Sequence, residues 1–236
     1  MTTKFDIAAN PSLKQLVYEK LQQMIIRGEL KPGERLTEED LSQAMNISRA
    51  PIREALNMLE RDGFTKIIPR KGAIVAEVSV KDSLDIWKCR LALEPFAAKE
   101  ACRNIPKDKV AMALVHIQEL ERQYDFEKYI ASDLEVHELY YTYLDNPYML
   151  TILNNLKAHS IRMRWLQENQ HQDMRTPQVS MQEHKKILEA FLHDDEDGAY
   201  AAVQEHIRNS STRLFVEKKS ADSEAQKEKP DLSFRK

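Results

Sequence analysis

Apolar residues recur every three to four positions through most of the chain, which is the period of an amphipathic α-helix. In the first part of the chain three such segments begin at Pro11, Thr37 and Ser48. Thr and Ser are common N-cap residues, and Pro fits the first turn of a helix. Gly28 and Gly63 follow the first and third segments, where glycine commonly ends a helix. The pattern predicts three short helices.

A different pattern follows these helices. Two runs rich in β-branched residues, Phe64–Ile68 and Ala73–Val78, are separated by a short turn. The turn contains Arg70 and Lys71, and Gly72 permits its tight geometry. The two runs therefore predict a β-hairpin with a basic tip. Three helices and such a hairpin form the layout of a winged helix-turn-helix, a DNA-binding fold.

Strand signals vanish beyond Val80. The periodicity predicts helices over 82–103, 107–123, 126–144, 147–167, 177–193 and 194–218. We expect a mainly α fold, in which the winged helix-turn-helix precedes an antiparallel all-α bundle of about six to seven helices. The predicted parts are a DNA-binding domain (1–79), an all-helical domain (80–218) and a polar, disordered tail (219–236).

Composition narrows the class of protein. Apolar residues make up 42% of the 236 positions, but no run reaches the roughly 18 needed to span a membrane. The start of the chain lacks the apolar segment of a signal peptide. Cys89 and Cys102 lie in one predicted helix without a metal-type or redox spacing. We expect a cytoplasmic protein with no membrane partner.

Charge alone does not predict DNA binding. The net charge is −3, and residues 1–80 hold 12 Lys and Arg against 11 Asp and Glu. Attraction to phosphates supplies most non-specific affinity for DNA. Because the total charge of this part is close to zero, DNA binding would require basic residues gathered on one surface.

Basic residues gather at the start of the third predicted helix. Arg49 and Arg53 are four residues apart and project from one face. Arginine binds guanine or a phosphate through two hydrogen bonds. Ser48 and the free N–H groups at the helix start suit a phosphate oxygen, and Pro51 is tolerated in the first turn. The alternative is that both arginines are solvated surface residues paired with nearby acids.

Residues 12–78 resemble the winged helix-turn-helix of the GntR regulator family. The matching segments are Gly28–Gly33, Leu36–Leu41, Ile47–Leu56, Leu59–Phe64 and Pro69–Gly72. The resemblance implies a homodimer on double-stranded DNA with a palindromic operator, Arg49 and Arg53 at bases or phosphates, and Gly72 at the wing tip. One departure is Glu39, where some fatty-acid-responsive members carry an arginine that contacts DNA.

Polar residues interrupt the apolar stripes of the helical domain. Asp133 and His137 share one stripe, while His184 and His206 lie on the stripes of the last two helices. Buried polar groups need partners, and one carboxylate with three imidazoles forms a site for Zn, Ni or Mn. The alternative is that each histidine is a satisfied core residue.

Residues 82–216 are similar to the FCD ligand-binding domain of the FadR-type branch of GntR regulators. The matching segments are Ile86–Glu94, Asp133–His137, Asn146–Pro147, Glu183–Ala190 and His206–Ile207. The resemblance implies that Asp133, His137, His184 and His206 hold a divalent metal and that a small carboxylate effector binds beside it. It also implies that Arg90 pairs with the effector carboxylate; a salt bridge to Glu94 is the alternative.

The sequence therefore predicts a ligand-responsive transcription regulator, and most such relatives repress. One rival function is a metal-dependent hydrolase of the helical HD type, suggested by His193–Asp194. Another is a regulator whose metal is structural or is itself the signal.

Overall fold

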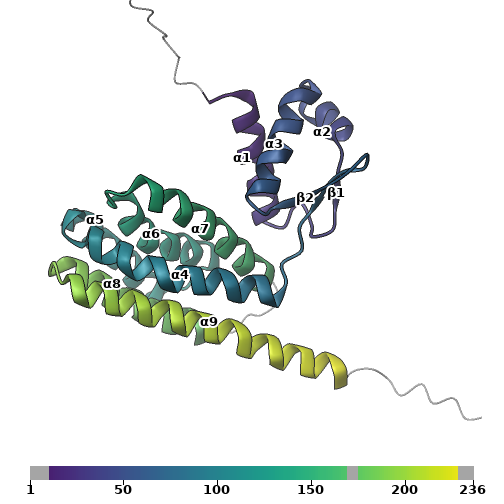
Figure 1. Cartoon of the computed structure of the whole chain (residues 1–236). Coiled ribbons are helices and arrows are strands. Elements are labelled where there is room, and N and C mark those ends of the chain that lie inside the picture. Colours follow the sequence, from purple (N-terminus) through teal and green to yellow (C-terminus); the bar gives the residue numbers. More distant parts are fainter. Residues whose placement is uncertain (1–10, 169–174, 228–236) are drawn as a thin grey trace, which may run out of the picture. The chain divides into compact units, whose positions relative to one another are not determined.

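The computed structural model describes residues 11–168 and 175–227 (Figure 1). These residues form two compact units. The first contains described residues 11–83 and 157–168, and the second contains 84–156 and 175–227. The division near Ser83 lies close to the predicted boundary, but the grouping of 157–168 with the first unit is not visible in the sequence pattern.

The first unit contains the three predicted helices, α1 (Leu13–Ile26), α2 (Glu38–Met45) and α3 (Arg49–Arg61). The hydroxyl of Thr37 accepts a hydrogen bond of 3.1 Å from the backbone N–H of Asp40 and so caps α2. Asn46 has φ 53°, the left-handed conformation that asparagine tolerates, and turns the chain from α2 into α3.

A three-stranded antiparallel sheet completes the winged fold. Its strands are β1 (Arg35–Leu36), β2 (Thr65–Ile68) and β3 (Gly72–Val75), in the order β1-β3-β2. The β2–β3 hairpin confirms the prediction. Strand β1 was not predicted, because two residues are too few to show an alternating pattern.

Gly72 permits a close approach of two strands. Its φ is +86°, and a Cβ atom at this position would lie 2.6 Å from the carbonyl oxygen of Leu36 in β1. The prediction that a glycine is required at the turn therefore has two physical reasons, the backbone conformation and the contact with β1.

The core of the first unit lies between the helices and the sheet, and its buried residues include Leu21, Ile52, Leu59 and Phe64. Residues 157–168 pack on this core. The ring of His159 stacks on Phe64 at 4.3 Å between centroids, and its Nε2 lies 2.7 Å from the carbonyl oxygen of Asp62. These contacts explain why this segment groups with the first unit.

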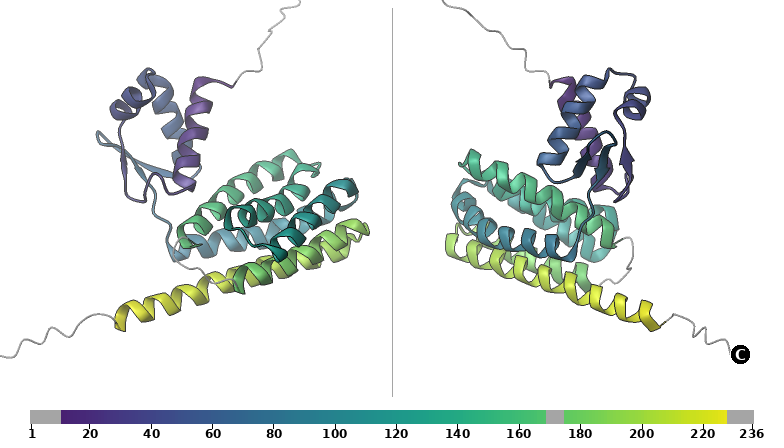
Figure 2. Two further views of the ribbon diagram at one scale, coloured as in Figure 1. Left: turned by 180° about the vertical axis from the view of Figure 1, so that it is seen from behind. Right: turned by 45° about the vertical axis from the view of Figure 1, so that its right-hand side comes forward.

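The second unit is helical throughout its described residues, which confirms the predicted fold class. It contains α5 (Lys107–Arg122), α6 (Phe126–Thr142), α8 (Arg175–Leu192) and α9 (Glu196–Lys227), most of α4 (Val80–Ala101), the first part of α7 (Pro147–Glu168) and a 3₁₀ turn at Cys102–Asn104. Both views of Figure 2 show them lying alongside one another. None of the helices in 11–168 and 175–227 is long and apolar enough to cross a membrane.

The end of α9 corrects one prediction. The helix continues from Lys218 to Lys227, so the expected disordered tail does not begin at 219. The added segment, Lys219–Lys227, contains Ala, Glu, Gln and Lys, which favour a helix even without an apolar face. The rest of the predicted tail, 228–236, lies outside the described residues.

Helix α8 contacts several other helices of the second unit. It packs against α5, α6 and α9. Its buried stripe of Met181, His184, Leu188 and Phe191 faces these neighbours. Polar residues on this stripe and on the facing stripes of α6 and α9 therefore meet in the interior.

Candidate DNA-binding surface and metal centre

The start of α3 is exposed and offers hydrogen-bond donors. Ser48 is its N-cap residue, and the Ser48 side chain makes no capping hydrogen bond. Pro51 lies in the first turn, as predicted. The side chains of Arg49 and Arg53 are 58% and 64% exposed. The helix start therefore presents two cations, a hydroxyl and unpaired backbone N–H groups to solvent.

Both arginines pair with acids of α2. Arg53 donates hydrogen bonds of 2.7 and 2.6 Å to the two carboxylate oxygens of Glu38, and Arg49 lies 3.2 Å from Glu39. The hydrogen bond from Arg53 lowers the pKa of Glu38. Pairing with acids is the alternative that the sequence left open, although the partners lie on another helix. Exposed ion pairs contribute little free energy, so either arginine can exchange its partner for DNA.

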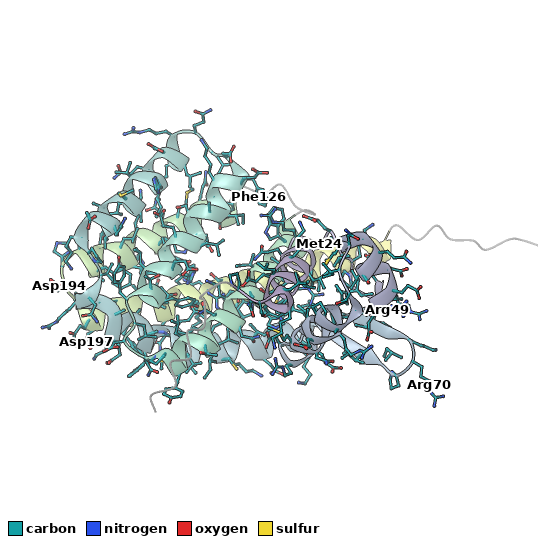
Figure 3. The ribbon with its side chains drawn as sticks, turned by 90° about the horizontal axis from the view of Figure 1, so that it is seen from above. Met24, Arg49, Arg70, Phe126, Asp194 and Asp197 are labelled. Carbon is teal, nitrogen blue, oxygen red and sulfur yellow. The ribbon has the colours of Figure 1, made fainter. Side chains whose placement is uncertain are left out.

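The tip of the hairpin is also basic. Arg70 and Lys71 are exposed, and Arg70 has φ 64° in the turn. The backbone carbonyl of Lys71 accepts a hydrogen bond of 2.6 Å from Nε of Arg35, which ties the tip to β1. Figure 3 shows Arg70 projecting outward at the end of the hairpin, in the same unit as Arg49.

The second unit contains a buried cluster formed by Asp133 and His137 of α6, His184 of α8 and His206 of α9. One donor atom from each of the four lies within 4.8 Å of the others. Nε2 of His184 is 3.5 Å from Oδ1 of Asp133 and 3.3 Å from Nε2 of His206. All four residues are at most 4% exposed. The structure brings together all four residues predicted to bind metal.

The two shorter separations, 3.5 Å from His184 to Asp133 and 3.3 Å from His184 to His206, match those of neighbouring ligands on one metal ion. With metal–ligand bonds of about 2.1 Å, adjacent ligand atoms lie about 3–3.5 Å apart. Nε2 of His137 is buried and has no hydrogen-bond partner among the described residues. A buried nitrogen without a partner is costly unless it binds something.

Two glutamates that the sequence analysis did not assign to the site contact its histidines. Nδ1 of His206 lies 2.8 Å from Oε2 of Glu183, and Nδ1 of His137 lies 3.2 Å from Oε2 of Glu94. Glu94 was considered only as a partner for Arg90. Glu183 lies off the apolar stripe of α8, so periodicity gave no signal for it.

Arg90 is buried and interacts with Glu94 and Trp87. Its guanidinium donates to both oxygens of Glu94 and lies 4.4 Å from the ring centre of Trp87. Burial alone would lower the pKa of Arg90, but the carboxylate of Glu94 outweighs it and raises that pKa. Burial alone would raise the pKa of Glu94, but Arg90 and His137 hold it well below its usual range. Arg90 is thus placed as in the salt-bridge alternative.

The charge of this interior favours a divalent cation. Among the described side chains of the second unit, the buried charged groups are one guanidinium, Arg90, and three carboxylates, Glu94, Asp133 and Glu183. Burial lowers the pKa of His206 and so favours its neutral form. Counted as ionised, the guanidinium and the three carboxylates sum to a net charge of −2. Unbalanced buried charge is costly, and a divalent ion would neutralise it.

The HD dipeptide does not join this cluster. His193 is exposed, and its Nδ1 contacts the carbonyl oxygen of Glu189 in its own helix. Asp194 pairs with Lys107 at the turn between α8 and α9, where Figure 3 labels it. Among residues 11–168 and 175–227, neither His193 nor Asp194 belongs to a group of three or more side chains that could hold a metal ion, as a hydrolytic metal site requires.

Comparisons with known proteins identify a family for the winged helix-turn-helix and for the helical part of the chain. The chain matches the family model for bacterial regulatory proteins of the gntR family over residues 13–75 and the model for the FCD domain over residues 85–209. The HTH-type transcriptional regulator YdhC of Bacillus subtilis is 27% identical over 84% of this chain and 88% of its own length. The HTH-type transcriptional repressor NanR of Klebsiella aerogenes is 29% identical over 90% of each chain.

A solved structure shows the same fold. E. coli McbR/YncC superimposes with a TM-score of 0.74 and 21% identity, over 88% of this chain and 99% of its own.

Proposed function

Since the chain belongs to the GntR family and is a DNA-binding transcriptional regulator with an FCD domain, we propose that it responds to a small carboxylate bound beside a divalent metal. The observation that carries this proposal is the convergence of Asp133, His137, His184 and His206 in the interior, with one donor atom of each within 4.8 Å of the others. A bound divalent ion supplies positive charge and open coordination positions that suit a carboxylate oxygen.

The chain's own residues determine what this site can do. The four ligands come from α6, α8 and α9, so occupancy links three helices that are separate in sequence. Three neutral imidazoles and one carboxylate suit Zn, Ni or Mn. That Arg90 pairs directly with the effector carboxylate stays a prediction. Its hydrogen bonds to Glu94 favour a role in holding that carboxylate in place.

For DNA, we propose a homodimer on a palindromic operator. The two copies of α3 would enter successive major grooves about 34–36 Å apart. Arg49 and Arg53 would contact bases or phosphates, with Ser48 and the helix start at a phosphate. Arg70 and Lys71 would contact the backbone or minor groove, and Gly72 keeps the tip close to β1.

The effector acts by binding one conformation of the dimer better than the other, since only differential affinity shifts an equilibrium. NanR, a relative, is named as a repressor. We propose repression that the effector relieves. The rival in which the metal is structural predicts no response to carboxylates, and the rival in which the metal is the signal predicts a response to metal alone.

The experiment first selects an operator from a random DNA pool with the full chain. Operator affinity is then measured for a panel of small carboxylates with the wild type, Asp133→Ala and the control Asp145→Ala, which removes an exposed acid of the same unit. We expect a carboxylate to weaken DNA binding by the wild type and the control, and Asp133→Ala to bind DNA without this response. An equal response in Asp133→Ala would reject the proposed site.

A further inference from the structure

The ring of His206 is held from its Nδ1 side by Glu183. Besides the contact of 2.8 Å with Nδ1, the second oxygen of Glu183 accepts a hydrogen bond of 2.9 Å from Nδ2 of Asn209. His206 and Glu183 are 1% and 5% exposed, so water competes little for these oxygens. The carboxylate is therefore held at both oxygens with one of them facing Nδ1.

The ring of His137 is held in a similar way by Glu94. Oε2 of Glu94 lies 3.2 Å from Nδ1 and accepts a hydrogen bond of 2.7 Å from the hydroxyl of Tyr140, which itself contacts Nδ1. Arg90 donates to both oxygens of Glu94, at 3.2 Å for Nη2. Glu94 is 0% exposed, so these groups fix its orientation.

This arrangement determines which ring nitrogen carries the proton. An ionised carboxylate only accepts hydrogen bonds, so the ring nitrogen that faces it carries the hydrogen. Tyr140 has one hydroxyl proton and donates it to Glu94, so its oxygen also faces His137 as an acceptor. A neutral imidazole protonated at Nδ1 leaves a lone pair on Nε2. Nε2 of His206 lies 3.3 Å from Nε2 of His184 in the cluster, and Nε2 of His137 is buried without a hydrogen-bond partner among the described residues.

We propose that Glu94 and Glu183 are positioning residues for the metal site. They fix the tautomer and the orientation of His137 and His206 before any ion binds, while Arg90 and Asn209 hold the two carboxylates in place. The inference rests on the proposed metal site and adds to it the groups that prepare two of its ligands. Loss of such a partner of a ligand histidine lowers metal affinity about 10–100-fold.

The test uses the full chain, stripped of metal and titrated with Zn²⁺. In Glu183→Gln, Asn209 still donates to the side-chain oxygen, so the new amide NH₂ faces Nδ1 and favours the tautomer with the proton on Nε2. We expect Glu183→Gln to bind Zn²⁺ about 10–100-fold more weakly than the wild type.

The matched control is Glu205→Gln. Glu205 directly precedes His206 on α9, is 53% exposed and pairs with Lys186 at 3.4 Å. The control makes the same change of charge beside the same ligand without touching its ring. We expect Zn²⁺ affinity within about twofold of the wild type, because an exposed ion pair contributes little.

A second readout reports the tautomers directly. Long-range ¹H–¹⁵N spectra of the metal-free chain, labelled at histidine nitrogens, distinguish a proton on Nδ1 from one on Nε2. We expect Nδ1–H for both His137 and His206 in the wild type. In Glu183→Gln we expect a change at His206 and none at His137, which a general loss of structure would not produce.

The possible results distinguish a failure of the metal site from a failure of the positioning role of Glu94 and Glu183. A wild type that binds no Zn²⁺ overturns the metal site and the positioning role together. A wild type that binds Zn²⁺, with Glu183→Gln binding equally well, overturns only the positioning role. An Nε2–H ring at His206 in the metal-free wild type also overturns it, even if the variant does not fold.

Discussion

The close contact at Gly72 predicts the effect of one added methyl group. In Gly72→Ala, alanine would adopt φ near +86°, which costs about 1–2 kcal/mol for an L-residue. Its Cβ would lie 2.6 Å from the carbonyl oxygen of Leu36, so β1 and β3 would have to separate. Forcing such a contact in a packed region costs about 1–3 kcal/mol more. We expect a total loss of roughly 2–5 kcal/mol in the stability of the first unit.

Two other glycines isolate the contribution of the contact. Gly28 and Gly33 have φ of +72° and +81°, and nothing lies within 4 Å of a Cβ at either position. Gly28→Ala and Gly33→Ala should therefore lose only the conformational part, about 1–2 kcal/mol. The difference between Gly72→Ala and these controls measures the clash with β1.

The assay is urea unfolding followed by the fluorescence of Trp165, which packs on the core of the first unit, in a Trp87→Phe background. Operator affinity is measured in parallel, because a displaced wing tip moves Arg70 and Lys71 away from DNA. Equal stability and equal DNA affinity of Gly72→Ala and Gly33→Ala would show that the contact with β1 adds no cost.

Three further predictions concern the DNA surface, the metal and pH. Arg49→Ala and Arg53→Ala should each weaken operator binding by about 1–3 kcal/mol in a fluorescence anisotropy titration, with unfolding changed by less than about 0.5 kcal/mol, because both are exposed; unchanged affinity would exclude them from the interface. A metal present at about 100 times its Kd adds about 2.7 kcal/mol, so chelation should lower Tm by roughly 5–11 °C, and no shift would argue against a bound ion. Burial lowers the pKa of His159 in the folded chain, so the unfolded chain binds its proton at higher pH and stability falls as pH falls below about 6.5. His159→Phe can keep the stacking on Phe64, so its stability, measured by urea unfolding at several pH values, should fall less at low pH than that of the wild type. The same pH dependence in both proteins would show that His159 is not the cause.

Much of the fold could be predicted because burial imposes a period on the sequence. The helices of both units show apolar residues at helical spacing, and the hairpin shows two β-branched runs around a turn. Strand β1 has no period of its own, since it forms only by pairing Arg35 and Leu36 with β3. Residues 157–168 join the first unit through contacts such as that of His159 with Phe64, which are far apart in sequence, so no local pattern encodes them.

The four cluster residues could be predicted because they interrupt apolar stripes, where a buried polar side chain is costly unless it has a partner. Glu183 breaks no stripe. Its burial comes from the packing of α8 against α9, which the sequence does not specify. The pairing of Arg49 and Arg53 with α2 is likewise a tertiary contact, which the spacing of the arginines along α3 does not reveal.

The proposals for the second unit all depend on one divalent metal ion in the buried cluster. Whether this ion is present can be measured by elemental analysis of the purified full chain by mass spectrometry, beside Asp133→Ala prepared in the same way. We expect about one divalent ion per wild-type chain and a much lower content in the variant, because a lost ligand weakens the site. A wild type without metal, or a variant with the same content as the wild type, would contradict this expectation.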